Sequence, residues 1–256
     1  MASTVSDSGP AAARQRMAQR SLTRSLTRDV RSLRRIIIPS RLEVTVPDWI
    51  AAVQVLVDQY GSASSALSAD YYDAARTAAR VAGRFDVPLA DPPPDEQVEN
   101  SLRWATKDLW PRDPDDPQTT EAQSEPMDVR LEQAEKKAEA VAQKLVVDQG
   151  RGTVQEAVRR DRQATAWARS AALGACSFCK LLATRGAVYK QDTADFQAHD
   201  GCHCGVVPVF KGQRFELSDH AREWERLYRE FAAPHSGDQL RRFRLALAEH
   251  GHQPTL

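Results

Sequence analysis

Residues 176–179 read CSFC, and residues 199–204 read HDGCHC. These two stretches contain all four cysteines of the chain and two of its six histidines. A C-x2-C pair can aim two thiolates at one ion, and a following H-x2-C-x-C run supplies an imidazole and further thiolates. Cysteines clustered in this way in a cytosolic context favour a metal site over a disulfide framework.

The segment offers more donors than a tetrahedral zinc ion can use. Our candidate metal ligands are Cys176, Cys179, His199, Cys202 and Cys204. In an extended segment, Cys202 and Cys204 lie on one face and His203 points away, so His203 is the weakest donor. We expect a structural zinc ion, while unligated thiols, a disulfide and a Cys–His catalytic site remain alternatives.

The composition bounds the class of protein. The chain has 256 residues, 41% of them hydrophobic, and a formal net charge of zero, so it is globular and not a uniformly basic nucleic-acid binder. The aliphatic run Ile36–Ile38 ends at Pro39, and we find neither a signal peptide nor an apolar run long enough to span a membrane. We therefore expect no membrane partner.

The first fifth of the chain is strongly basic, with nine arginines against four acidic residues in positions 1–50. Leu22, Leu26, Val30 and Leu33 form an apolar stripe at helical spacing within 11–35. The arginines are either the solvated face of a packed helix or a basic arm that meets DNA phosphates or an acidic protein surface. No aromatic residue is interleaved, which argues against stacking on single strands.

The chain is expected to be mainly α, with a helical N-terminal region and a C-terminal helical region that carries a small metal-stapled α+β module. The predicted divisions are a disordered tail at 1–10, a helical N-terminal region with the basic arm at 11–110, an acidic Pro-rich linker at 111–126, and a C-terminal domain at 127–256 with the Cys/His module at about 174–210.

Helical periodicity predicts several further elements. In the first half of the chain, helices are expected at 47–60, then, after a break at 61–65, from about 71 to 83, and again at 95–110. In the second half, helices are expected at 127–149 with a stop at 150–152, at 154–173, at 217–232 with Ser218 as a possible N-cap, and at 237–250. Strands are expected at 186–189 and 205–210.

Residues 164–210 resemble the C-terminal module of Mu F-like minor head proteins of tailed bacteriophages, in the form found in actinobacteriophages. The matching residues are Ala175–Cys179, Leu182-Ala183, Arg185-Gly186, Val188-Tyr189, His199, Cys202–Cys204 and Val206–Val209. The resemblance implies a minor capsid protein of head morphogenesis, found in the virion head and, during assembly, in the host cytoplasm. The implied partners are the portal protein, capsid and scaffold proteins, and packaged double-stranded DNA.

The resemblance leaves a second function open, because genes at the same position are often labelled capsid maturation protease. Such an enzyme would trim scaffold or capsid protein. Ser177, Ser218, His220 and His235 are present, but none lies in a recognisable nucleophile motif, so the catalytic residues are unknown and we lean towards a protein that is not an enzyme. A zinc-stabilised DNA-binding protein unrelated to phage is the third hypothesis.

Overall fold

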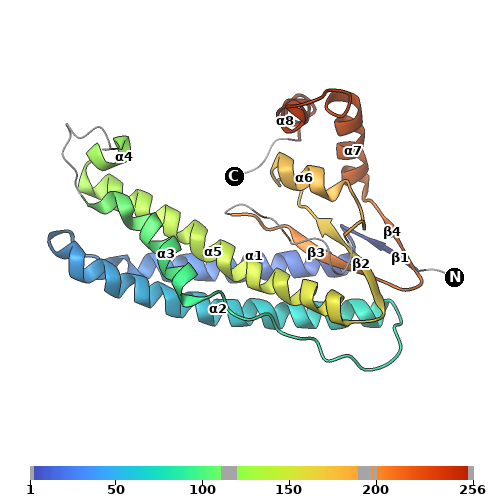
Figure 1. Ribbon diagram of the computed structural model, residues 1–256, viewed down its shortest axis with the longest axis horizontal. Coiled ribbons are helices and arrows are strands. Elements are labelled where there is room, and N and C mark those ends of the chain that lie inside the picture. The colour runs from blue at the N-terminus through green and yellow to red at the C-terminus, as the bar shows by residue number, and fades with distance from the viewer. Residues whose placement is uncertain (1–2, 111–119, 190–195, 197, 199–200, 253–256) are drawn as a thin grey trace. The chain divides into compact units, whose positions relative to one another are not determined.

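The computed structural model describes residues 3–110, 120–189, 196, 198 and 201–252 (Figure 1). Helices dominate these residues, which confirms the mainly α fold class. The chain divides into two compact units. The bundle unit contains residues 20–64 and 91–149, and the strand unit contains residues 1–19, 65–90 and 150–256. Each unit therefore combines segments from before and after the stretch 111–126, a division that the sequence did not predict.

Parts of three long helices and one shorter helix build the bundle unit. These are α1 (Pro10–Leu33), α2 (Leu42–Ala78), α5 (Met127–Arg160) and α3 (Asp95–Thr106). The short elements η1 (Arg34–Ile36), η2 (Pro39–Arg41), η3 (Lys107–Leu109) and α4 (Glu121–Ser124) complete it. Leu26 and Val30 are fully buried in its core, as the apolar stripe predicts. Residues 111–119 of the predicted linker lie outside the described residues.

Helix α2 begins at Leu42, before the predicted start at 47, and joins the two predicted helical pieces into one helix that ends at Ala78. It contains Pro47 in its second turn and continues through 61–65, where we expected a break. Gly61 has a packing role rather than a helix-ending one, because a Cβ there would lie 2.0 Å from Gln149 Oε1. The missing side chain makes room for the Gln149 side chain of α5 against α2.

The prediction for 150–173 is wrong in two ways. Gly150-Arg151-Gly152 does not end the helix, since α5 runs unbroken to Arg160. The stretch expected to be helical after 160 instead contains strand β2 (Ala164–Ser170). Alanine has the highest helix propensity, but propensity differences are below about 1 kcal/mol per residue. The backbone groups of this stretch pair with strand β3, so the tertiary pairing overrides the local preference.

The strand unit contains two small sheets. Strand β2 pairs antiparallel with β3 (Gly205–Phe210), with Arg169 opposite Val206. Strand β1 (Ser3–Ser6) pairs parallel with β4 (Gln213–Glu216). The strand expected at 205–210 is confirmed, whereas that at 186–189 is reduced to one bridge between Tyr189 and Trp167.

The N-terminal segment differs from the disordered tail predicted at 1–10. Strand β1 lies there, and the Asp7 side chain that follows it is fully buried. The backbone N–H of Ser218 donates to Asp7 Oδ1 at 2.7 Å. A buried carboxylate needs such donors, and the two shortest contacts come from the backbone N–H and the hydroxyl of Ser218, more than 200 positions away in the sequence.

Three further helices contribute to one apolar cluster of the strand unit: α6 (Ser177–Ala183), α7 (Asp219–Phe231) and α8 (Gln239–Glu249) (Figure 1). The predicted N-cap of α7 is confirmed, because the Ser218 hydroxyl accepts the Ala221 N–H. Trp224, Leu227 and Phe243 pack with the buried cysteines in one apolar cluster. Among the described residues, no helix combines the length and the apolar character needed to cross a membrane.

Candidate metal centre

The first pair of cysteines is positioned by the start of α6. Cys176 is the N-cap, in extended conformation, and its sulfur accepts the Cys179 backbone N–H at 3.4 Å. This turn places Cys179 one turn into the helix, where its side chain is fully buried. The C-x2-C spacing therefore orders the helix start as well as presenting a thiol.

The second pair of cysteines precedes β3 in the chain. Cys202 and Cys204 are both buried, whereas His203 between them is only partly covered. The Nδ1 atom of His203 lies 3.0 Å from the Gly201 carbonyl oxygen. The two thiols thus share one side of an extended segment, as the alternation of side chains predicts.

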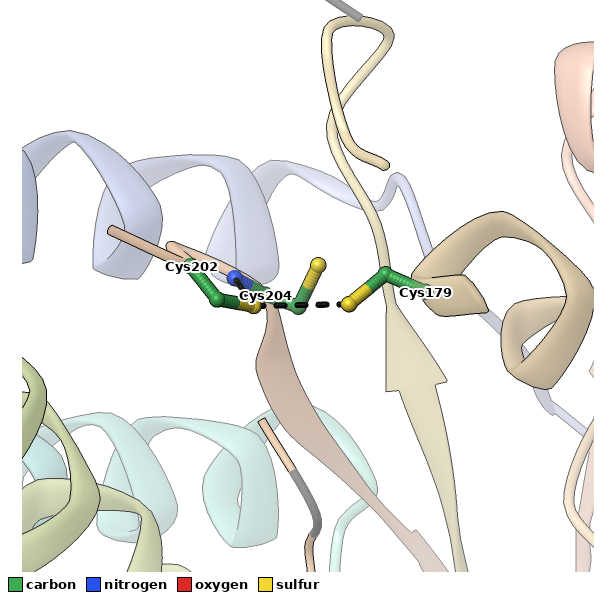
Figure 2. A group of neighbouring side chains, drawn as sticks. All are labelled: Cys179, Cys202 and Cys204. Carbon is green, nitrogen blue, oxygen red and sulfur yellow. Dashed lines mark hydrogen bonds between the residues drawn. The ribbon is translucent and has the colours of Figure 1, made fainter. Parts of the chain in front are cut away.

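Cys179, Cys202 and Cys204 form a cluster that we call the thiol triad. Their sulfur atoms all lie within 4.8 Å of one another, and those of Cys179 and Cys202 are 3.4 Å apart (Figure 2). Thiolates bound tetrahedrally to zinc at about 2.3 Å would be about 3.8 Å from each other, so the spacing fits one ion. This triad can bind a metal ion. Three thiol donors suit zinc, iron or copper(I) rather than magnesium or calcium.

Two buried arginines hold the triad from the side of α5 and β2. The Arg169 guanidinium donates to the Cys179 sulfur at 3.5 Å, and Arg151 Nε donates to the Cys204 carbonyl oxygen at 2.8 Å. Both guanidinium groups lie against the ring of Phe196, with Cζ to centroid distances of 3.7 Å for Arg169 and 4.7 Å for Arg151. Positive charge next to thiolates offsets the cost of burying them.

The thiols of the triad differ in pKa. Hydrogen bonds with the Cys179 and Cys204 thiols lower the pKa of Cys202. Hydrogen bonds with Cys176, Cys202 and Cys204, together with burial, raise the pKa of Cys179. The first thiolate of the cluster is therefore that of Cys202, which the neighbouring S–H groups stabilise. A metal ion would replace the remaining protons, because metal ligands must be deprotonated.

A buried lysine lies on the same helix as Cys179. Lys180 is fully buried, its ammonium group donates to the His252 carbonyl oxygen, and it lies 5.3 Å from the centre of the Trp224 ring. Burial lowers the pKa of Lys180. The amine is thus occupied in joining the C-terminal segment to α6.

The structure brings together three of the five residues that the sequence proposes as ligands. Cys176 lies next to them but its sulfur is not part of the triad, and His199 lies outside the described residues. The full ligand set therefore stays a prediction. Sequence reasoning missed Arg151 and Arg169, which it assigned to a helix stop and a basic helix. No pattern marks them, because a buried arginine differs from an exposed one only in what the fold places beside it.

A second group of polar side chains contains a serine and a histidine. The Ser218 hydroxyl lies 2.8 Å from Asp7 Oδ2 and 3.1 Å from His220 Nε2, and it accepts the Ala221 N–H. A carboxylate can only accept, so the one hydroxyl proton of Ser218 goes to Asp7. In this arrangement His220 Nε2 acts as a donor to Ser218, which is the opposite of the role of a general base. The group caps α7 and anchors the N-terminal segment.

Comparison with known proteins adds one finding. The sequence profile of the VG15 protein family matches residues 7–231. No curated protein and no solved structure matches the chain at a significant level. The matched range includes the thiol triad, both buried arginines and the segment that carries the head-protein resemblance. Because the match covers most of its length, the chain belongs to the VG15 family of viral gene 15 proteins and is a phage-encoded protein.

Proposed function

We propose that this phage protein is a structural component of the phage head, a minor capsid protein of head morphogenesis. It associates with the portal vertex or lies inside the prohead, with portal, capsid or scaffold proteins as its partners. The resemblance of residues 164–210 to Mu F-like minor head proteins supports this role, as does membership of a phage family.

The observation that carries the proposal is the closed thiol triad. Cys179, Cys202 and Cys204 are all buried and in contact, and α6 and β3 hold them in an apolar cluster. A catalytic cysteine needs one accessible thiolate next to a base, and a catalytic metal needs an open position that substrate can reach. A buried cluster of three thiols suits a structural metal, which we propose to be zinc.

The role in the head is tested by locating the protein in purified particles. Mass spectrometry of mature virions and of isolated proheads should detect the chain at a constant ratio to the portal protein. Disrupting its gene should yield few infectious particles, with capsid and scaffold proteins still processed. Absence of the protein from both kinds of particle would contradict the proposal.

The metal is tested on the purified full-length chain by native mass spectrometry. We expect one zinc ion per chain, with the cysteine thiols unreactive to alkylation until a chelator is added. A metal-free protein whose four thiols all react without chelator would remove the structural metal from the proposal.

The second candidate function is a capsid maturation protease, because the contact between Ser218 and His220 brings two residues of hydrolase chemistry together. The direction of the Ser218 hydrogen bond argues against an activated nucleophile there. Incubation with capsid and scaffold proteins, using the Ser218→Ala variant as a comparison, separates the two functions. Cleavage by the original chain that is lost in Ser218→Ala would favour the protease.

A further inference from the structure

The outward face of α1 in the bundle unit is lined with arginines. From residue 20 onward the exposed residues of α1 are all arginine or serine, and Arg35 continues the face in η1. The arginines of this face are Arg20, Arg24, Arg28, Arg31 and Arg35. At 100° per residue these five fall within an arc of about 80°, over a length of about 22 Å. We call them the arginine face.

The opposite side of the helix explains why the arginine face points outward. Leu26 and Val30 are fully buried, with Leu22 and Leu33 packed against the same core. This apolar stripe is centred roughly 180° from the arginines around the helix axis. The core of the bundle unit thus fixes the direction in which the arginines project.

Internal ion pairs neutralise only part of the arginine face. Arg31 makes a two-point contact with Glu139, at 2.6 and 3.0 Å, and Arg28 lies 3.3 Å from Asp29. Within the described part of the chain, no ion pair involves Arg20, Arg24 or Arg35. At least three cationic groups therefore remain available to an external anion.

The chemistry of the face favours nucleic acid over protein. A protein interface has an apolar core with polar residues around it, and the arginine face has no exposed apolar residue from position 20 to the end of α1. Single-stranded nucleic acid is bound by aromatic stacking, and no aromatic residue is present in α1. Arginine and serine side chains are, by contrast, common donors to the phosphates of a duplex.

We propose that the arginine face binds the backbone phosphates of double-stranded DNA without reading its sequence. Successive arginines at i and i+4 are about 6 Å apart along the helix, and a duplex offers one negative charge per about 1.7 Å of its axis. An arginine face about 22 Å long therefore meets phosphates wherever it lies along the backbone. This inference deepens the proposed function, since DNA is what a phage head contains.

The test uses the full-length protein and fluorescently labelled duplexes of two unrelated sequences and equal length. Anisotropy is measured from 50 to 200 mM salt, for the original chain and for the variant Arg20→Gln/Arg24→Gln/Arg35→Gln. The matched control is Arg222→Gln/Arg226→Gln/Arg229→Gln, which removes the same charge from exposed positions on α7. Because all six positions are exposed, circular dichroism should show folded proteins throughout.

We expect both duplexes to bind equally and more weakly as salt rises. The α1 variant should bind at least tenfold more weakly at 100 mM salt. Its plot of log K against log salt should also be less steep, with a slope smaller in magnitude by about 2 to 3, since each phosphate contact contributes about 0.9. The α7 control should bind nearly as the original does.

Three outcomes would overturn the inference: no duplex binding at 50 mM salt, equal binding by the α1 variant and the original chain, or equal losses in the α1 and α7 variants. Binding to polyglutamate as tight as binding to DNA would also overturn it, because an acidic protein surface would then be the better partner. Detection of the protein in heads is a separate measurement, so failure here would leave the proposed function intact.

Discussion

The four cysteines have different tasks although they are identical residues. The Cys176 sulfur accepts a backbone N–H at the start of α6, whereas those of Cys179 and Cys202 are in direct contact. The sulfur atoms of Cys179, Cys202 and Cys204 lie close enough together to share one ion. Spacing along the chain could not make this distinction, and it treated Cys176 and Cys179 as an equal pair.

Serine substitutions should separate these tasks. Cys179→Ser, Cys202→Ser and Cys204→Ser should each abolish stoichiometric zinc binding, because a serine hydroxyl is a poor zinc ligand. Each should also lower the melting temperature by several degrees. Metal content of the purified variants and thermal melts measure both effects. Retention of one zinc per chain in all three variants would contradict the triad as the metal site.

Cys176→Ser is the control that also tests the fourth ligand. Serine caps helices well, so the cap on α6 survives the substitution. If Cys176 only caps, zinc content stays at one per chain. If zinc is lost, Cys176 is the fourth ligand, and His199→Ala should then keep its zinc.

Among the residues of the strand unit outside the thiol triad, Asp161 is the one whose substitution should lower the free energy of unfolding most. Its Oδ2 accepts Arg76 Nε at 2.7 Å and the Tyr72 hydroxyl at 3.1 Å, and all three residues are buried. Asp161→Asn leaves the buried guanidinium without its anion, which should cost about 3 kcal/mol in urea unfolding. The exposed pair of Glu99 and Arg103 supplies the comparison, since Glu99→Gln should cost less than about 0.5 kcal/mol. Similar costs for both would show that burial does not govern the Asp161 pair.

Helix contacts depend on where side chains are missing as much as on where they are present. In the bundle unit, Gly61 on α2 faces the side-chain amide of Gln149 on α5, which would have to shift to admit a methyl group. Local sequence reasoning treats a glycine inside a helix as a break, since glycine costs about 1 kcal/mol relative to alanine. The close contact with Gln149 accounts for a glycine at this position.

Gly61→Ala should therefore destabilise the protein by about 1 to 2 kcal/mol, despite the better helix propensity of alanine. The added Cβ would collide with the Gln149 amide, which would have to move. Urea unfolding of Gly61→Ala, Gln149→Ala and the double variant measures the coupling. In the Gln149→Ala background, Gly61→Ala should become neutral or stabilising. Equal effects in both backgrounds would rule out the contact as the reason for the glycine.

Strand β2 shows a different limit of local reasoning. Its sequence, ATAWARS, is rich in alanine and was assigned to a helix, but it pairs along its length with β3. That pairing places Arg169 beside Cys179, so the same error concealed a residue in contact with the thiol triad. The pairing partner is about forty residues away, beyond the reach of any periodicity within the segment.

At the scale of the whole molecule, the two units have separate cores. The core of the bundle unit contains residues such as Val98 and Leu102, and the strand unit contains the cluster around the thiol triad together with a second apolar cluster around Tyr72 and Trp167. A metal ion can stabilise only the structure that closes around it, because its binding energy is gained when its ligands are brought together. Metal removal should consequently affect the two units unequally.

Hydrogen exchange with and without chelator should reveal this difference. We expect chelation to raise amide exchange in β2, α6 and β3, while amides of α3 in the bundle unit keep most of their protection. Mass spectrometry of peptides from each unit measures the change. A chelator added to Cys202→Ser, already without metal, should change nothing and serves as the control. An equal rise in α3 and in β3 would show that the metal stabilises the whole chain rather than one unit.

The sequence by itself determined the mainly α class, the apolar stripe of α1, the Ser218 cap and strand β3. It also located the cysteine cluster, because these features depend on side-chain periodicity or on spacing within a few residues. The tertiary structure alone decided that Gly61 and Gly150–Gly152 lie inside helices, that 164–170 is a strand, and that Asp7 is buried. It also decided which cysteines meet and which arginines accompany them. Each of these depends on a partner distant in the chain, and the free energy of that contact exceeds the weak local preference of the residues involved.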